Sequence, residues 1–169
     1  TAVITGANTG IKPSKDMAWR LSAGYELPLA GLGALTVMGM FEQLSYSQDE
    51  ATGAADLEDY SRMAWLLGAK FRAGDHEFRA RYAQGLNPDC TLADGTDCGD
   101  VEDFGAQQFA LGYAYHLAKS TQVYAFYTQI MNEDLAQYTL TIGGSPAVAG
   151  ATPAGADPMA LGAGIRFAF

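Results

Sequence analysis

The chain has 169 residues, enough for one domain, yet no stretch approaches the roughly 18 uninterrupted apolar residues that a membrane-spanning helix needs. Its 20 Gly, 9 Tyr and 8 Phe, set in short alternating segments, favour an all-β fold, and the net charge of -9 argues against a nucleic-acid-binding protein. Because the first residue is Thr and no signal peptide is recognisable, we expect a chain that was processed or that is a piece of a longer protein.

Seven segments alternate apolar with polar or small residues, and this period of two predicts strands. In the first segment Trp19 and Leu21 share the apolar face, while Arg20 and Glu26 lie on the other. The sixth segment is apolar on both faces, so its orientation stays open. The predicted strands are 16–27, 34–46, 60–72, 76–85, 105–117, 122–133 and 158–169.

The connections between these strands alternate in length. The short ones are 28–33, 74–75 and 118–121, and the long ones lie near 1–15, 47–59, 86–104 and 134–156. Antiparallel barrels of the outer membrane have short periplasmic turns and long external loops, whereas a soluble sandwich has no reason to sort its loops by side. The pattern therefore predicts an all-β, transmembrane, antiparallel up-and-down β-barrel.

Aromatic residues recur on the apolar face, where they suit the two girdles that flank the hydrocarbon layer. The alternative is that these rings form the core of a β-sandwich. The opposite face carries charge and glycine, which favours the barrel. The predicted girdle residues are Trp19, Tyr25, Trp65, Phe71, Tyr113, Tyr115, Phe167 and Phe169.

Two stretches resemble one known family. Residues 112–127 read GYAYHLAKSTQVYAFY and residues 162–169 read GAGIRFAF. They are similar to a hairpin and the closing strand that are typical of general Gram-negative porins, above all the sixteen-stranded Neisseria and Burkholderia type. Ala118 and the Ser120–Thr121 pair depart from that pattern. The likeness is strong over 105–169 and rests on pattern alone over 16–85.

This resemblance implies that residues 1–169 are the C-terminal portion of a single porin barrel. It implies a homotrimer in the outer membrane, in contact with lipid and lipopolysaccharide, that lets ions and small hydrophilic solutes diffuse passively. It also implies that the barrel-assembly machinery recognises the C-terminal strand, with Phe169 as the insertion signal. Seven strands are too few and odd in number, so either the N-terminal half is absent or 2–4 and 138–142 belong to further strands.

Basic residues gather on the inward parity of the predicted strands. Because charge facing lipid costs about 2–4 kcal/mol at the bilayer midplane, exclusion from lipid alone explains part of this bias. The functional interpretation is a basic pore wall, with Arg20, Arg62, Arg79 and Arg81 in the constriction and a preference for anions. The acidic loops argue for cations instead. The predicted pore-lining residues are Arg20, Arg62, Lys70, Arg72, Arg79, Arg81 and Arg166.

The Gly74-Asp75 pair predicts a two-residue hairpin turn, which sets Lys70 opposite Arg79 and Arg72 opposite Glu77. Like charges in direct opposition destabilise an ordinary sheet, but water in a pore screens them.

Cys90 and Cys98 lie eight residues apart in an acidic segment, and we expect them to form a loop disulfide in an oxidising compartment. Two free thiols are the alternative. A zinc site lacks further ligands nearby, and the acids of this loop do not match a calcium-loop spacing.

No cofactor, metal or catalytic site is predicted. His76 and His116, the only histidines, are expected near the periplasmic rim, and no nucleophile motif or phosphate loop accompanies them. The predicted function is therefore a passive channel rather than an enzyme. The main alternative is a small plugged barrel with a structural or adhesive role.

Overall fold

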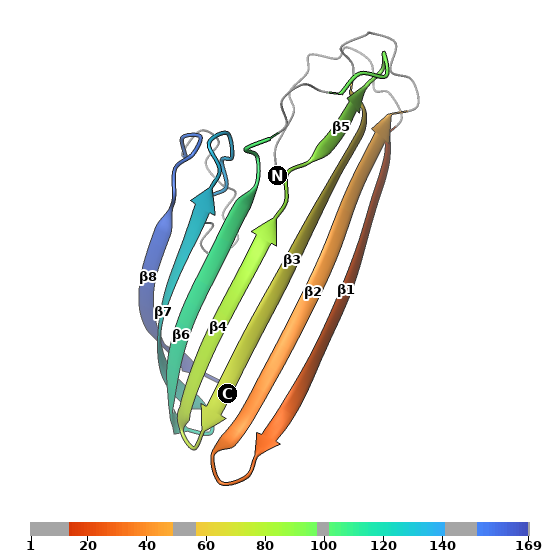
Figure 1. Cartoon of the computed structure of the whole chain (residues 1–169). Coiled ribbons are helices and arrows are strands. Elements are labelled where there is room, and N and C mark those ends of the chain that lie inside the picture. The colour runs from red at the N-terminus through yellow and green to blue at the C-terminus, as the bar shows by residue number, and fades with distance from the viewer. Residues whose placement is uncertain (1–13, 49–56, 98–101, 141–151, 169) are drawn as a thin grey trace.

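The computed structural model describes residues 14–48, 57–97, 102–140 and 152–168. These residues form one curved sheet of long, inclined strands (Figure 1). Within the described residues, no helix is long and apolar enough to cross a membrane. The strands are β1 (Ser14–Leu29), β2 (Gly33–Gln48), β3 (Leu57–Ala73), β4 (His76–Gly85), β5 (Asp89–Leu92), β6 (Ala106–Ala118), β7 (Thr121–Asn132) and β8 (Met159–Phe167).

The sheet is an antiparallel meander with the order β1-β2-β3-β4-β6-β7-β8, and the short β5 pairs with β3 beside this path. This confirms the predicted all-β, up-and-down fold and all seven long strands. In the described part of the chain the sheet is open, with β1 and β8 as its edges. A closed barrel would therefore need strands beyond those described here.

Short turns gather at one end of the sheet and long connections at the other (Figure 1). Residues 30–32, 74–75 and 119–120 make the short turns, as the sequence pattern predicted. Gly33, the first residue of β2 after the first short turn, has a φ of +129°, and a Cβ there would lie 2.0 Å from the carbonyl oxygen of Arg72. Only glycine fits a left-handed conformation pressed against a neighbouring backbone.

The strand β5 was not predicted, because it falls inside the segment 86–104 that was expected to be a loop. Pro88 lacks a backbone N–H and interrupts the ladder after β4. The chain then pairs again with the N-terminal end of β3, where Cys90 lies opposite Tyr60. The suggested strand at 138–142 is not present at residues 138–140, and its remainder, like residues 2–4, lies outside the described residues.

The pairing register divides the side chains of the long strands between two faces, because paired residues share a face and neighbours along a strand alternate. On one face, named here the arginine face, Arg20 lies opposite Glu42 and Lys70 opposite Arg79. On the other, the apolar face, Leu67 lies between Gly39 and Tyr82. The register also fixes β7, whose orientation the sequence left open.

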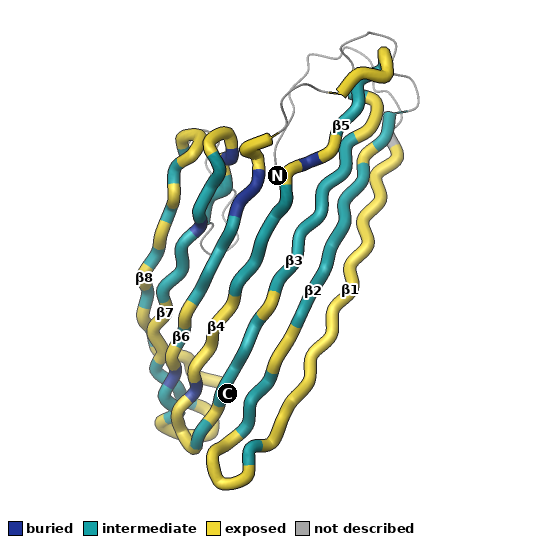
Figure 2. Tube along the Cα trace, in the orientation of Figure 1, coloured by how far each residue is buried: buried dark blue, intermediate teal, exposed yellow. Residues whose placement is uncertain are grey.

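Neither face is a dry core. Among the described residues no large side chain is fully buried, and Leu67 and Leu161 of the apolar face are 58% and 83% exposed. Figure 2 shows how little of the sheet is buried, with β1 exposed along most of its length. Within the described residues there is thus no second sheet or dry core of the kind that the sandwich alternative requires.

The direction of curvature follows from burial. The buried residues described within the long strands are Glu77, Ala106, Ala114 and Ile130, and all four lie on the arginine face. Side chains converge and shield one another on the concave side of a curved sheet. We infer that the arginine face is concave and the apolar face convex.

Candidate functional site: a basic wall behind aromatic girdles

Aromatic rings cross the apolar face in a line. Three pairs of rings are in contact across neighbouring strands. Their centroid distances are 5.3 Å for Trp19–Phe41, 5.2 Å for Trp65–Tyr82 and 5.5 Å for Phe109–Tyr127. Each pair is diagonal, since Phe41 is paired in register not with Trp19 but with Leu21, two residues nearer the short turns. Between the pairs the rings are directly opposite, as Phe41 is to Trp65. From Trp19 on β1 to Tyr127 on β7, the line crosses five pairs of neighbouring strands. Over these five steps it shifts by six residues towards the short turns.

This slope gives the tilt of the strands. If the rings mark one level in a bilayer, a drop of six residues at about 3.3 Å over five steps of about 4.8 Å corresponds to a tilt of about 40°. Outer-membrane barrels tilt by about 35–45°. On β3 the apolar face runs from Met63 to Ala73, on the short-turn side of Ser61, and this stretch is about 33 Å long. At this tilt it spans about 25 Å along the membrane normal. That height matches the apolar band of such barrels.

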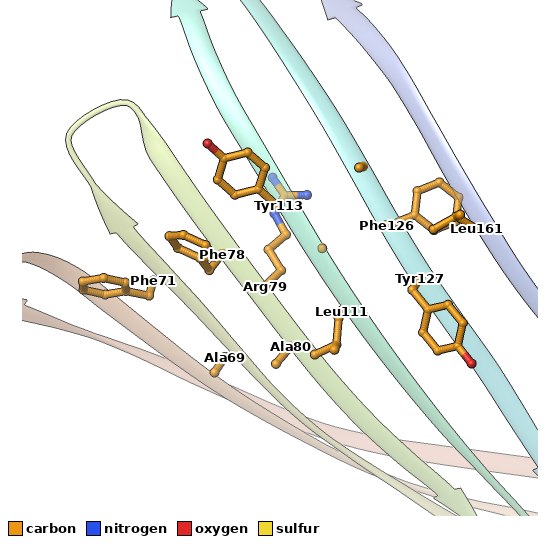
Figure 3. A pocket seen from close by; sticks show the side chains of 12 residues that line it. Ala69, Phe71, Phe78, Arg79, Ala80, Leu111, Tyr113, Phe126, Tyr127 and Leu161 are labelled. Carbon is orange, nitrogen blue, oxygen red and sulfur yellow. The ribbon is translucent and has the colours of Figure 1, made fainter.

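A second line of rings lies nearer the short turns. The Phe78 and Tyr113 centroids are 5.2 Å apart, and His76 lies 5.0 Å from Tyr115. His76 Nδ1 is 2.8 Å from the Tyr113 hydroxyl. Figure 3 shows the rings of Phe78 and Tyr113 in front of the sheet and the guanidinium of Arg79 behind the β6 ribbon. His76 is thus part of this interfacial line of rings, close to the short-turn end where it was expected.

The seven basic residues singled out in the sequence all lie on the arginine face, by the register that connects β1 through β8. Lys70 lies opposite Arg79 and Arg72 opposite Glu77, which confirms the register predicted from the Gly74-Asp75 turn. The seven are Arg20, Arg62, Lys70, Arg72, Arg79, Arg81 and Arg166.

Four of these cations form one patch on β3 and β4. Lys70, Arg72, Arg79 and Arg81 share this patch with a single carboxylate, Glu77. Glu77 is 4% exposed and forms an ion pair with Arg79, whose side chain remains 55% exposed. The patch is therefore strongly positive.

Small residues and a histidine border the patch on β6. Gly112 faces Arg79 and Ala110 faces Arg81, so both guanidinium groups have room. His116 Nε2 lies 3.5 Å from the Glu77 carboxylate; it is buried and accepts or donates no hydrogen bond among the described residues. Among the described residues, neither Lys70 nor Arg81 forms an ion pair.

A comparison with protein families decides what kind of protein this is. The family model of Gram-negative porins matches residues 2–135. The chain belongs to the Gram-negative porin family. A comparison with curated proteins gave no match. The match covers β1 to β7, including the strands that the sequence had tied to porins by pattern alone.

Membership in this family fixes the location of the protein. A Gram-negative porin resides in the outer membrane, and in barrels of that membrane an outward apolar band flanked by aromatic girdles faces lipid. The family resemblance drawn from the closing strands is confirmed at this level, and the sheet is an unclosed part of a porin barrel wall.

The four residues expected in the constriction do not form one group. Arg20 forms an ion pair with Glu42, in a register row that crosses β4 at Gly85. Arg79 lies six residues further along β4, about 20 Å away along the strand. Lys70 and Arg72, which were not among the four residues expected in the constriction, are the nearest basic neighbours of Arg79 and Arg81.

Arg62 has a different role from the rest of the set. Its Nη2 donates to the carbonyl of Phe104 at 3.4 Å, and its guanidinium lies 4.6 Å from the ring centroid of Tyr138. Both partners belong to long connections at the far end of the sheet from the short turns. No local signal in the sequence pointed to Tyr138, because the contact joins positions 76 residues apart.

The remaining predicted sites are only partly described. Cys90 lies on β5, whereas Cys98 and Phe169 lie outside the described residues, so the disulfide and the insertion signal stay predictions. Near Cys90, the Thr96 hydroxyl and backbone N–H donate to the Asp94 carboxylate and lower the pKa of Asp94. Among the described residues, no group of His, Cys, Asp or Glu could hold a metal ion.

Proposed function

We propose that this porin forms a passive, water-filled channel for ions and small hydrophilic solutes. We propose further that it belongs to the sixteen-stranded Neisseria and Burkholderia type, in which this chain would be the C-terminal portion of a single barrel and the porin a homotrimer of such barrels. The observation that carries the proposal is the segregation of charge: seven basic side chains share the concave face, while the convex face is apolar. A wall of this kind separates lipid from water.

The alternative is a plugged barrel with a structural or adhesive role. Ion pairs such as Arg20–Glu42 and Arg79–Glu77 would fill its interior. Against this stand Lys70 and Arg81, which have no ion pair within the described residues. Unpaired cations inside a dry plug would be costly, whereas water in a channel solvates them.

Conductance distinguishes the two functions. The full-length porin, with all of its strands, is reconstituted in a planar lipid bilayer. A channel gives discrete current steps that grow with salt concentration, whereas a plugged barrel stays silent. Silence of folded, membrane-inserted protein would overturn the proposal.

We propose further that the patch on β3 and β4 favours anions. Fixed positive charge beside a narrow aqueous path raises the local concentration of anions. Replacing both Arg79 and Arg81 with Gln should shift the reversal potential in a salt gradient toward cation selectivity. Lys119→Gln, in the exposed 119–120 turn, is the matched control that removes charge away from the wall. An unchanged reversal potential in the double variant would contradict the assignment.

The apolar face would then contact outer-membrane lipid and lipopolysaccharide, and the barrel-assembly machinery would engage the β8 strand through the terminal Phe169. Phe167, the last described residue of β8, is 64% exposed on the apolar face. An aromatic end to a lipid-facing strand is consistent with such recognition. Deleting Phe169 should lower the amount of folded porin in the outer membrane without changing the conductance of the channels that do insert.

A further inference from the structure

The segment that follows β7 stays close to the sheet. Glu133 N–H donates to the carbonyl of Gly105 at 3.0 Å, and Leu135 N–H donates to the carbonyl of Asp103 at 3.0 Å. These bonds extend the β6–β7 ladder beyond the long-loop ends of both strands. A Cβ on Gly105 would lie 2.6 Å from the Glu133 carboxylate, which accepts the Gly105 N–H. The first part of the segment is thus fixed in place.

The chain then turns onto the arginine face at Tyr138. Asn132, an arginine-face residue at the end of β7, accepts a hydrogen bond from Tyr138 N–H and donates one to the Tyr138 carbonyl, both at 3.0 Å. Ala136 is 2% exposed, and its carbonyl accepts a bond from Gly155 N–H. This part of the segment is therefore held by hydrogen bonds to Asn132 on one side and to Gly155 on the other.

Arg62 meets Tyr138 from across the sheet. It belongs to β3, which is three strand steps from β7, a distance of about 14 Å across the face. A Cβ on Gly85 of β4 would lie 2.9 Å from Arg62 Nη2, so the side chain passes over β4 where that strand has no side chain. Arg62 ends beside Phe104 and over the Tyr138 ring.

We propose that residues 133–140 form an inward segment that narrows the channel at its long-loop end. Tyr138 is the constricting residue, and Arg62 is a positioning residue that holds its ring by a cation–π contact. The inference deepens the proposed channel function and rests on it. It assigns size discrimination to this end of the concave face, separate from the basic patch nearer the short turns.

Chemical modification of a cysteine at position 138 tests the placement in the full-length porin in planar bilayers. Tyr138→Cys channels should lose part of their single-channel current when treated with a charged methanethiosulfonate reagent, because the added group would lie in the ion path. Lys119→Cys, in a short turn, and the unsubstituted porin are the controls and should keep their current. A Tyr138→Cys channel that conducts normally after complete modification would overturn the inference. Absence of current from every protein would instead reject the channel function.

The role of Arg62 is tested by the passage of neutral polymers of graded size. Arg62→Gln and Tyr138→Leu should each raise the largest size that enters the channel, because the first change frees the ring from its cation–π partner and the second removes the ring. Tyr138→Phe keeps the ring and should behave like the unsubstituted porin. The double variant should show no further increase, since both changes remove the same contact. Additive effects, or an unchanged size limit in Arg62→Gln, would show that Arg62 does not position Tyr138.

Discussion

Leu66 and Leu67 provide a direct test of which face meets lipid. They are the same residue in adjacent positions of β3, and they point to opposite faces. Leu67 lies near the middle of the apolar stretch from Met63 to Ala73 and is 58% exposed. Leu66 lies on the arginine face, between Met40 and Ala83. Replacing each leucine with arginine makes the same chemical change at both positions. Under the proposed arrangement, the new charge would face lipid at position 67 and water at position 66.

Leu67→Arg should lower the free energy of unfolding by about 2–4 kcal/mol, the cost of arginine on the lipid face at the bilayer midplane. Leu66→Arg should cost about 1 kcal/mol or less, because water in the lumen solvates the guanidinium. The measurement is the urea midpoint of the full-length porin folded in phospholipid vesicles. Equal costs, or a larger cost for Leu66→Arg, would refute the assignment of the two faces.

Two further predictions concern a turn and a loop. Gly31→Ala should cost about 1–2 kcal/mol, the price of a left-handed alanine with open space around it, whereas Gly33→Ala should cost more because its Cβ would lie 2.0 Å from the Arg72 carbonyl oxygen; equal urea midpoints for the two variants would show that the turn can adjust. If Cys90 and Cys98 form the predicted disulfide, a thiol-alkylating reagent should add mass to the denatured porin only after reduction, and labelling before reduction would favour free thiols.

The arrangement of strands and faces could be predicted because the signals are local. Alternation along each strand predicted the seven long strands, and the Gly74-Asp75 turn alone predicted that Lys70 lies opposite Arg79. The segment 122–133 gave no clear parity, since aromatic residues occur on both faces. The neighbouring strand β8 explains why an aromatic residue occurs on the arginine face of β7. A Cβ on Gly162 would lie 2.5 Å from the Phe126 ring. The ring covers a glycine of β8, so it packs against the wall on the arginine face.

The contacts that distinguish Arg62 from the other basic residues could not be predicted in the same way. Parity predicts the face of Arg62 but not that its guanidinium crosses β4 over Gly85 to Tyr138. Likewise, nothing near Asn132 indicates that its amide bonds both backbone groups of Tyr138. These contacts depend on which strands and loops lie next to one another in the fold. The alternation of apolar and polar residues along a single strand does not indicate this.

The direct opposition of Lys70 and Arg79 favours the proposal that the concave face is in contact with water. Two like charges about 4 Å apart repel by about 1 kcal/mol in water, and by several times more in a medium of lower dielectric constant. Glu77 offsets part of this through its ion pair with Arg79, but Arg72 and Arg81 add two more cations beside it. One carboxylate cannot neutralise four cations, so a dry interior would expel the patch or force it to lose charge. The same sheet is stable when water and mobile anions fill the space in front of it, which is the condition that a diffusion channel provides.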